Sequence, residues 1–327
     1  MNREFIKKQY YKLFNDDSVD FMDLATDIFK YQSKENPVYR KFLQLIGKEN
    51  IKIEYISDFP FMPISFFKTN EVKTGNWRQS LHFESSTTTG SIPSIHLVRD
   101  LDHYLKNTEL CYKYFYGNVS DYCFLALLPS YLERNTSSLI YMIRHFIEIS
   151  GCGKFYKDDY EELYKDVINY SGNKKIIIFG VTFALIQFCE KYTLKGDFTV
   201  IETGGMKGRG GELPRDAVHN ILKNGLNIDS VYSEYGMTEL FSQAYSSSSG
   251  IFKLPPSMSV LIQDIYDPYN FVQNGKQGKI NIVDLANIDS CSFISTDDLG
   301  VKNPDGSFKI LGRTDSSDVR GCNLLFS

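Results

Sequence analysis

The sequence predicts an α/β protein with a parallel or mixed sheet, followed by a small antiparallel β subdomain. Between residues 122 and 234, short apolar runs alternate with segments of helical spacing, a pattern typical of parallel sheets covered by helices. After residue 250 the helical spacing stops, and strand patterns alternate with turns such as Asn274-Gly275. With 327 residues, 42% of them hydrophobic, the chain can bury a large core in one or two domains.

The individual elements follow from local patterns. Helical spacing runs from Asn2 to about Gln44, whereas two prolines within residues 58–68 favour an extended buried segment. That segment is either a packed connection or a pocket wall in which Lys68 faces an acidic ligand. Asp100 or Asp102 is expected to cap a helix that ends near Tyr116. The remaining expected strands are 81–83, 94–98, 122–128, 175–180, 198–202, 229–234, 258–263, 279–284, 292–296 and 308–311, and the remaining expected helices are 137–149, 182–192 and one from about Pro214.

Composition excludes several classes of function. The formal net charge of −4 provides no basic field for nucleic acid or an anionic membrane surface. The N-terminus lacks an apolar signal core and no apolar run reaches the length of a membrane span, so we expect a cytoplasmic protein without an integral membrane segment. The six cysteines include no C-x-x-C pair, which argues against a zinc site or a disulfide framework. Cys123 and Cys189 are expected to be small buried hydrophobic residues.

A loop rich in hydroxyl groups separates strands 81–83 and 94–98. Five hydroxyl residues, 85–89, precede Gly90, so backbone N–H groups and side-chain hydroxyls can converge on an anion. Taken alone, this loop favours an ordinary polar turn. Further strands end in loops that carry glycines, hydroxyls or carboxylates, at residues 203–211, 235–239, 296–300 and 312–315. Together these loops suit a nucleotide with its phosphates, a divalent cation and a ribose.

In this order the five loops resemble the core motifs of the adenylate-forming (acyl-activating) superfamily. Among its branches the chain is most similar to the acyl-protein synthetases of the LuxE family, to which phenylacetate-CoA ligases are related. The resemblance covers residues from about Phe61 to the C-terminus. It implies a large adenylate-forming domain at 1–312 with mixed α/β lobes and a β subdomain at about 250–312. A short tail, 313–327, stands in place of the mobile C-terminal domain that carries a catalytic lysine in most relatives.

The resemblance also assigns roles to individual residues. Thr238 and Glu239 belong to the matched motif Y-G-x-T-E, in which Thr238 hydrogen-bonds the α-phosphate and Glu239 holds Mg²⁺. The alternative for Glu239 is an acidic residue in the first turn of a helix. The implied ATP-binding residues are Ser86, Thr88, Thr89 and Gly90 at the β- and γ-phosphates, Gly204 and Gly205 beneath the adenine, Tyr235 and Gly236 in the motif, and Asp298 and Arg313 near the ribose. Lys207 or Arg209 can add phosphate contacts.

Some positions depart from the family pattern. Thr87 replaces a glycine, and Ser94 replaces a lysine that follows the loop in many relatives. Both changes imply weaker ATP binding or a loop used in another step. Asp297 replaces a glycine beside Asp298, which leaves open which aspartate faces the ribose. The pair Arg313 and Asp315 matches the hinge motif G-R-x-D, with a surface β-turn as the alternative.

The tail carries a candidate nucleophile. Residues 318–326 resemble the end of the acyl-protein synthetases, whose cysteine near the C-terminus accepts the acyl group as a thioester, and Cys322 matches it. Arg313 and Arg320 would lower the pKa of this thiol, and Gly321 would let the tail swing. The alternative is a small residue that packs the last turn.

The implied function is that of an ATP-dependent ligase. It activates a carboxylic acid, expected to be a fatty acid, with ATP and Mg²⁺ as acyl-AMP, and transfers the acyl group to Cys322. Apolar residues of 61–67, 139–149 and 181–185 are candidates for an acyl pocket or ordinary core. One alternative is an acid–thiol ligase that uses CoA or a carrier-protein phosphopantetheine, and another is an acyltransferase or binding partner that no longer uses ATP. Expected partners are an acyl carrier protein, a reductase or an acyltransferase.

Overall fold

A mixed sheet runs through most of the molecule. The computed structural model describes residues 2–16, 18–86, 92–129, 135–204, 213–246 and 249–314. Five strands pair in parallel in the order β8-β7-β6-β4-β5. They are β4 (Tyr122–Leu127), β5 (Gly153–Tyr156), β6 (Lys175–Val181), β7 (Phe198–Thr203) and β8 (Val231–Tyr235). Every residue of β4 is buried, as expected for a central strand covered on both faces.

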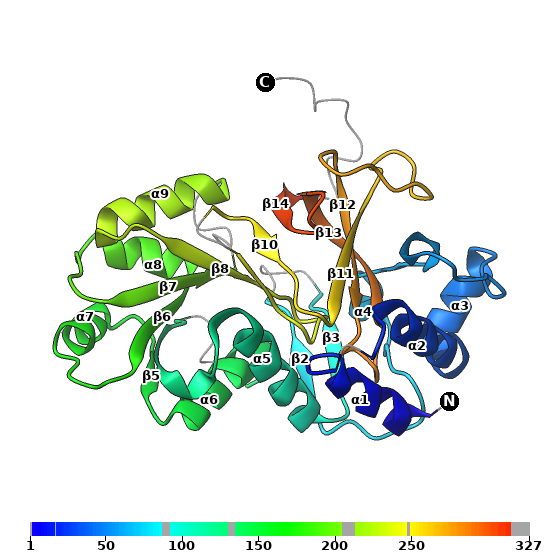
Figure 1. The fold of residues 1–327 in the computed structure, drawn as a ribbon, viewed down its shortest axis with the longest axis horizontal. Helices are drawn as coiled ribbons and strands as arrows, with labels where there is room; N and C mark the ends of the chain where they lie inside the picture. Colours follow the sequence, from blue (N-terminus) through cyan, green and yellow to red (C-terminus); the bar gives the residue numbers. More distant parts are fainter. Residues whose placement is uncertain are drawn as a thin grey trace.

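Helices cover both faces of this parallel part. They are α5 (Leu101–Tyr116), α6 (Ser138–Ser150), α7 (Tyr160–Ile168), α8 (Thr182–Cys189) and α9 (Arg215–Leu226). Figure 1 shows α8 and α9 on one side of β6–β8, and α5 and α6 on the other. Asp100 caps α5 by accepting a hydrogen bond from the His103 N–H at 3.0 Å. The predicted α/β alternation is confirmed, although α8 ends three residues before the predicted end at Tyr192.

The predicted antiparallel strands form a meander of β11 (Met258–Gln263), β12 (Gln277–Asp284), β13 (Phe293–Lys302) and β14 (Phe308–Arg313). This β subdomain is joined to the parallel part by hydrogen bonding. β9 (Ala244–Ser246) pairs with β8, and β10 (Phe252–Lys253) pairs with both β9 and β14. The only residue pair between β10 and β14 in the described register is Phe252 with Phe308. The two parts are therefore connected by a narrow strip of sheet.

The N-terminal region is helical, as predicted, with α1 (Arg3–Lys12), α2 (Phe21–Glu35) and α3 (Pro37–Leu45). Figure 1 shows these helices beside β11–β13. Phe59 stacks on Phe293 of β13 with ring centroids 4.5 Å apart. Gln32 of α2 donates to the carbonyl oxygen of Asn287 at 2.8 Å. Two turns of 3₁₀-helix, η1 (Ile56–Asp58) and η2 (Val119–Asp121), complete the connections.

The segment 58–68 is only partly extended. β1 (Met62–Pro63) pairs with β13, but α4 (Phe66–Thr69) is helical, so the prediction of an extended segment to Lys68 was wrong at its end. Proline restricts the residue before it, and no proline follows Pro63 in this segment. β2 (Leu81–Glu84) and β3 (Ile95–Val98) form the predicted antiparallel pair beside the hydroxyl loop.

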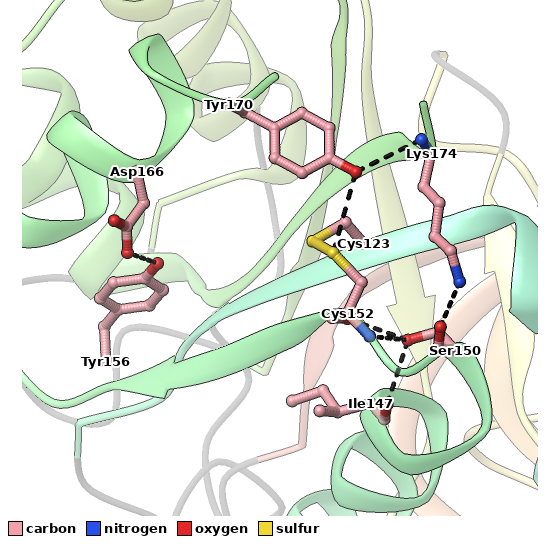
Figure 2. The surroundings of a disulfide bond; sticks show 8 residues. All are labelled: Cys123, Ile147, Ser150, Cys152, Tyr156, Asp166, Tyr170 and Lys174. Atoms are coloured by element: carbon pink, nitrogen blue, oxygen red, sulfur yellow. Dashed lines mark hydrogen bonds between the residues drawn. A yellow bond between two sulfur atoms is a disulfide. The ribbon is translucent and has the colours of Figure 1, made fainter. Parts of the chain in front are cut away.

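Cys123 and Cys152 form a disulfide bond, which corrects the expectation that Cys123 is an isolated buried thiol. The two cysteines are 29 residues apart in sequence, but β4 and β5 are parallel neighbours with Phe124 opposite Gly153. This register places the preceding residues side by side, with Cα atoms 4.7 Å apart. Figure 2 shows the bond beside Ser150 and Tyr170. Among the described cysteines, Cys111, Cys189 and Cys291 are free and buried, and no described helix meets the length and hydropathy of a membrane span.

We expect reduction of this disulfide to lower the free energy of unfolding by about 3 kcal/mol, because closing a loop of this length restricts the unfolded chain. Urea unfolding with and without reductant measures the difference. The Cys152→Ser variant serves as the control, since its stability should not respond to reductant. Equal unfolding curves for the wild-type protein in both conditions would contradict the assignment.

A second prediction concerns His103, which is buried between α1, α5 and the segment after β12. Its ring nitrogens contact the Tyr11 hydroxyl at 2.8 Å and the Ala286 carbonyl oxygen at 3.0 Å. Burial lowers the pKa of His103 from 6.5 to about 4. The unfolded chain therefore binds this proton more tightly, so the stability from neutral His103 is complete above pH 6.5 and is lost as the pH falls toward 4.

At pH 4.5 this loss amounts to about 2.5 kcal/mol relative to pH 7. Urea unfolding of the wild-type protein and of His103→Gln at the two pH values isolates it, because the variant lacks the titrating ring. We expect the variant to lose less stability than the wild-type protein on acidification. Identical losses would show that His103 does not titrate in this range.

Candidate functional site

The candidate site lies where β7 and β8 end. Parallel strands place their carboxyl ends at one edge of a sheet, where ligands bind in open α/β folds. β7 leads directly into Gly204, and β8 ends at Tyr235, the first residue of the Y-G-x-T-E motif. Thr203 lies opposite Glu234 in the register, so the two loops leave the sheet side by side.

Three predicted site residues meet at one carboxylate. The Tyr235 hydroxyl donates to Asp298 Oδ2 at 2.7 Å, and Arg313 Nε donates to Asp298 Oδ1 at 2.8 Å. Asp298 and Arg313 lie opposite each other on β13 and β14. Asp298 is buried whereas Asp297 is exposed, so Asp298 is the aspartate that faces the motif. Each Asp298 oxygen has a further lone pair with which it can accept another hydrogen bond.

The ring of Tyr235 is also engaged. It packs against Phe252 and Phe308, with ring centroids 5.8 and 5.6 Å away. Tyr235 is buried, and burial is the main cause of its strongly raised pKa, with a further contribution from the Asp298 carboxylate. The hydroxyl therefore stays protonated and acts as a donor. This contact joins the end of β8 to the β subdomain.

Glu239 is 5% exposed. Burial raises its pKa above 4.5, against the opposing effects of the Ser94 hydroxyl and the positive charges of Arg313 and Lys68. The positive charge of Arg313 therefore acts on Glu239 in addition to pairing with Asp298. Residues 236–243 form no helix, so the alternative that Glu239 stabilises the first turn of a helix is not supported.

The surroundings of Glu239 fit a magnesium ligand. A carboxylate oxygen is the ligand that Mg²⁺ prefers, and a cation would stabilise the ionised form that burial disfavours. Among the described residues, no group of three or more His, Cys, Asp and Glu side chains is arranged to hold a metal ion. One or two protein carboxylates are sufficient where substrate phosphates and water complete the shell of Mg²⁺.

Glycine suits positions 204 and 236 for different structural reasons. Gly204 has φ 76°, a left-handed conformation that favours glycine. At Gly236 an added Cβ would lie 2.4 Å from Glu234 Oε1. A side chain at position 236 would therefore displace the Glu234 carboxylate, which accepts a hydrogen bond from Thr203. Gly205 lies outside the described residues.

Two buried glutamates support these loops, and sequence reasoning did not select them. Glu202 on β7 accepts hydrogen bonds from Thr182 at 2.7 Å and Ser233 at 2.6 Å, and it forms an ion pair with Arg215. Glu234 on β8 accepts from Thr203, and burial is the main cause of its pKa of about 7. In the sequence, both could have been recognised as glutamates within apolar strands, each just before a glycine-containing loop or motif.

Of the hydroxyl loop, the structure describes the two ends, up to Ser86 and from Ile92. The Ser94 N–H donates to Ser85 Oγ at 2.8 Å, and the Ser85 N–H donates to the Ser94 carbonyl oxygen at 3.1 Å. Ser86 is exposed at the start of the loop. Outside the described residues lie the predicted residues Thr87, Thr88, Thr89, Gly90, Lys207, Arg209, Asp315, Arg320 and Cys322.

We expect Gly236→Ala to lower the free energy of unfolding by about 2 kcal/mol, because the added methyl group collides with the Glu234 carboxylate. Adding Glu234→Ala removes the collision, so the double variant should lose less than the sum of the two single losses. Urea unfolding of all four proteins completes the cycle. Strict additivity would indicate that the two side chains do not interact.

Comparison with known proteins places this arrangement in a family. The model of the LuxE acyl-protein synthetase family matches residues 9–327. A search of curated protein sequences found no significant match.

Several solved structures of ligases share the fold. ATP-bound MatB from Rhodopseudomonas palustris is 15% identical, with a TM-score of 0.55 over 72% of this chain and 48% of MatB. O-succinylbenzoate coenzyme A synthetase (MenE) from Bacillus subtilis, in complex with ATP and magnesium, is 17% identical, with a TM-score of 0.52 over 72% and 50%. A malonyl-CoA ligase with methylmalonyl-CoA and AMP bound is 16% identical, with a TM-score of 0.54 over 73% and 53%.

These likenesses establish the adenylate-forming fold, and the chain spans about half the length of the ligases. The family match extends over nearly the whole sequence, including the Y-G-x-T-E motif and the residues that meet at Asp298. The chain belongs to the LuxE acyl-protein synthetase family.

Proposed function

We propose that this protein activates a carboxylic acid with ATP and Mg²⁺ as an acyl-adenylate and then transfers the acyl group to a thiol. The main support is the convergence of Tyr235, Asp298 and Arg313, which come from three different strands and are joined by hydrogen bonds. Each of these residues belongs to a separate motif of the adenylate-forming superfamily. The similar ligases were solved with ATP, with ATP and magnesium, or with AMP bound.

In the first step an oxygen of the substrate carboxylate attacks the α-phosphorus of ATP, and the bond to pyrophosphate breaks. The proposed role of the Thr238 hydroxyl is to donate to the α-phosphate. Glu239 would hold Mg²⁺, which would supply positive charge where negative charge develops at phosphorus. The proposed role of Asp298 and Arg313 is to orient the ribose, since a carboxylate can accept hydrogen bonds from both hydroxyls of a vicinal diol.

In the second step a thiolate attacks the acyl carbon, the bond between that carbon and the AMP oxygen breaks, and a thioester forms. We propose Cys322 as the first acceptor, with Arg313 and Arg320 favouring its thiolate. A thioester keeps the acyl group reactive for transfer to a protein partner such as a carrier protein, a reductase or an acyltransferase. A fatty acid is the proposed substrate, with the apolar residues of 61–67, 139–149 and 181–185 as candidates for its acyl pocket.

A second candidate is an acid–thiol ligase that uses CoA or phosphopantetheine. It is favoured by the fold likeness to a malonyl-CoA ligase solved with methylmalonyl-CoA and AMP bound. The third candidate, an acyltransferase or binding partner that no longer uses ATP, rests on Thr87 and Ser94 in place of the family glycine and lysine.

Exchange of labelled pyrophosphate into ATP tests the adenylation step. We expect exchange that depends on a fatty acid and on Mg²⁺, and about a 100-fold lower rate in Glu239→Gln, because that variant lacks the metal-binding carboxylate. Asp297→Asn is the matched control, since Asp297 is exposed beside Asp298 and should exchange normally. Absence of acid-dependent exchange in the wild-type protein would refute ATP-dependent activation and favour the third candidate.

Labelling with a radioactive fatty acid and ATP tests the acceptor. We expect label on the wild-type protein that hydroxylamine releases, as it does for a thioester, and no such label on Cys322→Ser. Cys189→Ala should label normally, because Cys189 is buried between α8 and α9. Exchange without protein labelling, together with product formation on added CoA or phosphopantetheine, would favour the second candidate.

A further inference from the structure

His96 on β3 contacts the backbone of the Y-G-x-T-E motif. Its Nδ1 lies 2.8 Å from the carbonyl oxygen of Thr238. The imidazole ring is fully buried, stacks on Phe241 with centroids 4.8 Å apart, and meets the edge of Phe67 at 5.5 Å. Aromatic rings on both sides therefore fix the orientation of a nitrogen that reaches the residue before Glu239.

The hydrogen bond determines the tautomer of the ring. A carbonyl oxygen can only accept, so Nδ1 carries the proton and Nε2 carries a lone pair. His96 Nε2 is buried and has no hydrogen-bond partner among the described residues. Burying an unpaired polar atom is unfavourable, and an apolar side chain in this aromatic slot would avoid that cost. The contact with Thr238 is therefore the structural feature that a histidine provides here and an apolar residue would not.

Ser94 lies two residues earlier on the same segment. It is 2% exposed and closes the base of the hydroxyl loop through both of its backbone groups. Its hydroxyl favours the ionised form of Glu239 and so opposes the burial that raises the pKa of that carboxyl. The segment 94–96 therefore connects the base of the hydroxyl loop to the Thr238 carbonyl group.

We propose that His96 is a positioning residue that holds the Thr238–Glu239 turn in register with the hydroxyl loop by donating Nδ1–H to the Thr238 carbonyl oxygen. The proposal rests on the proposed adenylation function for its effect on rate, but the hydrogen bond itself can be measured without activity. Ser94 assists from the same segment, which gives a structural role to the residue that replaces the family lysine.

Side chains that keep or move the donor provide the first test. The amide nitrogen of asparagine can occupy the place of Nδ1, whereas the amide of glutamine reaches nearer to Nε2, and phenylalanine fills the slot with no donor. We expect His96→Asn to keep the rate of pyrophosphate exchange within about threefold of wild type. His96→Gln and His96→Phe should lose about tenfold and need more Mg²⁺ for half-maximal exchange, because a net hydrogen bond is worth about a factor of ten.

His82→Asn is the matched control, since His82 lies on the neighbouring strand β2 opposite Leu97 and is not part of the candidate site. Its exchange rate and magnesium dependence should equal those of the wild-type protein. If folded His96→Phe exchanges like wild type, or if the asparagine and phenylalanine variants lose activity equally with unchanged magnesium dependence, His96 acts by packing alone.

The tautomer in the wild-type protein provides a test that does not depend on enzymatic activity. With ¹⁵N-labelled histidine, a two-bond ¹H–¹⁵N spectrum distinguishes the two neutral tautomers, and His96→Asn identifies the resonance of His96 among the five histidines. We expect protonated Nδ1 and bare Nε2 for His96. The opposite tautomer would overturn the proposal, whereas the expected tautomer in a protein without exchange activity would retain the hydrogen bond and reject the adenylation function.

Discussion

The structure depends on hydrogen bonds to the backbone N–H and C=O groups of a buried turn that has no regular secondary structure. Residues 239–243 are buried, yet 236–243 form neither helix nor strand, so their N–H and C=O groups need partners from elsewhere. Side chains supply them. The Thr238 carbonyl accepts from His96, the Glu239 carbonyl from Asn287, the Phe241 carbonyl from Asn107, and the Phe241 and Ser242 N–H groups donate to Asp284. The geometry of the Y-G-x-T-E motif is therefore set by strands and helices far from it in sequence.

Asp284 also joins the β subdomain to the motif, because it is the last residue of β12. Its buried carboxylate accepts from the Phe241 N–H at 2.8 Å and from the Ser242 hydroxyl at 2.7 Å. Burial raises the pKa of Asp284, and these donors oppose the rise by favouring the ionised form. The β subdomain is thus joined to the motif at Asp284 as well as at Asp298. Two carboxylates of the β subdomain therefore position the site. In the described part of the sheet, by contrast, the β subdomain is paired with the parallel part only through β10 and β14.

Local sequence patterns predicted the features that depend on residues close together in the sequence. The alternation of strands and helices, a helix cap at Asp100 or Asp102 and the β2–β3 pair follow from spacing within a few residues. The motif order assigned Tyr235, Asp298 and Arg313 to one nucleotide site, but it did not predict the hydrogen bonds that join them. The partners that depend on strand order were not predictable in the same way. Cys123 and Cys152 become neighbours only because β4 and β5 are adjacent and in that register. Glu202 and Glu234 appeared as ordinary strand residues, because their donors come from α8, α9 and neighbouring strands.

The effect of Ser94, which replaces a family lysine, depends on the residues that surround it in the folded chain. By sequence alone, the loss of a lysine removes a positive charge near the phosphates. In the folded chain, position 94 is buried at the base of the loop, where its backbone pairs with Ser85 and its hydroxyl favours the ionised form of Glu239. A lysine ammonium there would be desolvated unless Glu239 paired with it, and such a pair would engage the carboxylate that fits Mg²⁺. Serine brings no charge that would compete with a cation for Glu239, so the substitution alone does not argue for loss of ATP use.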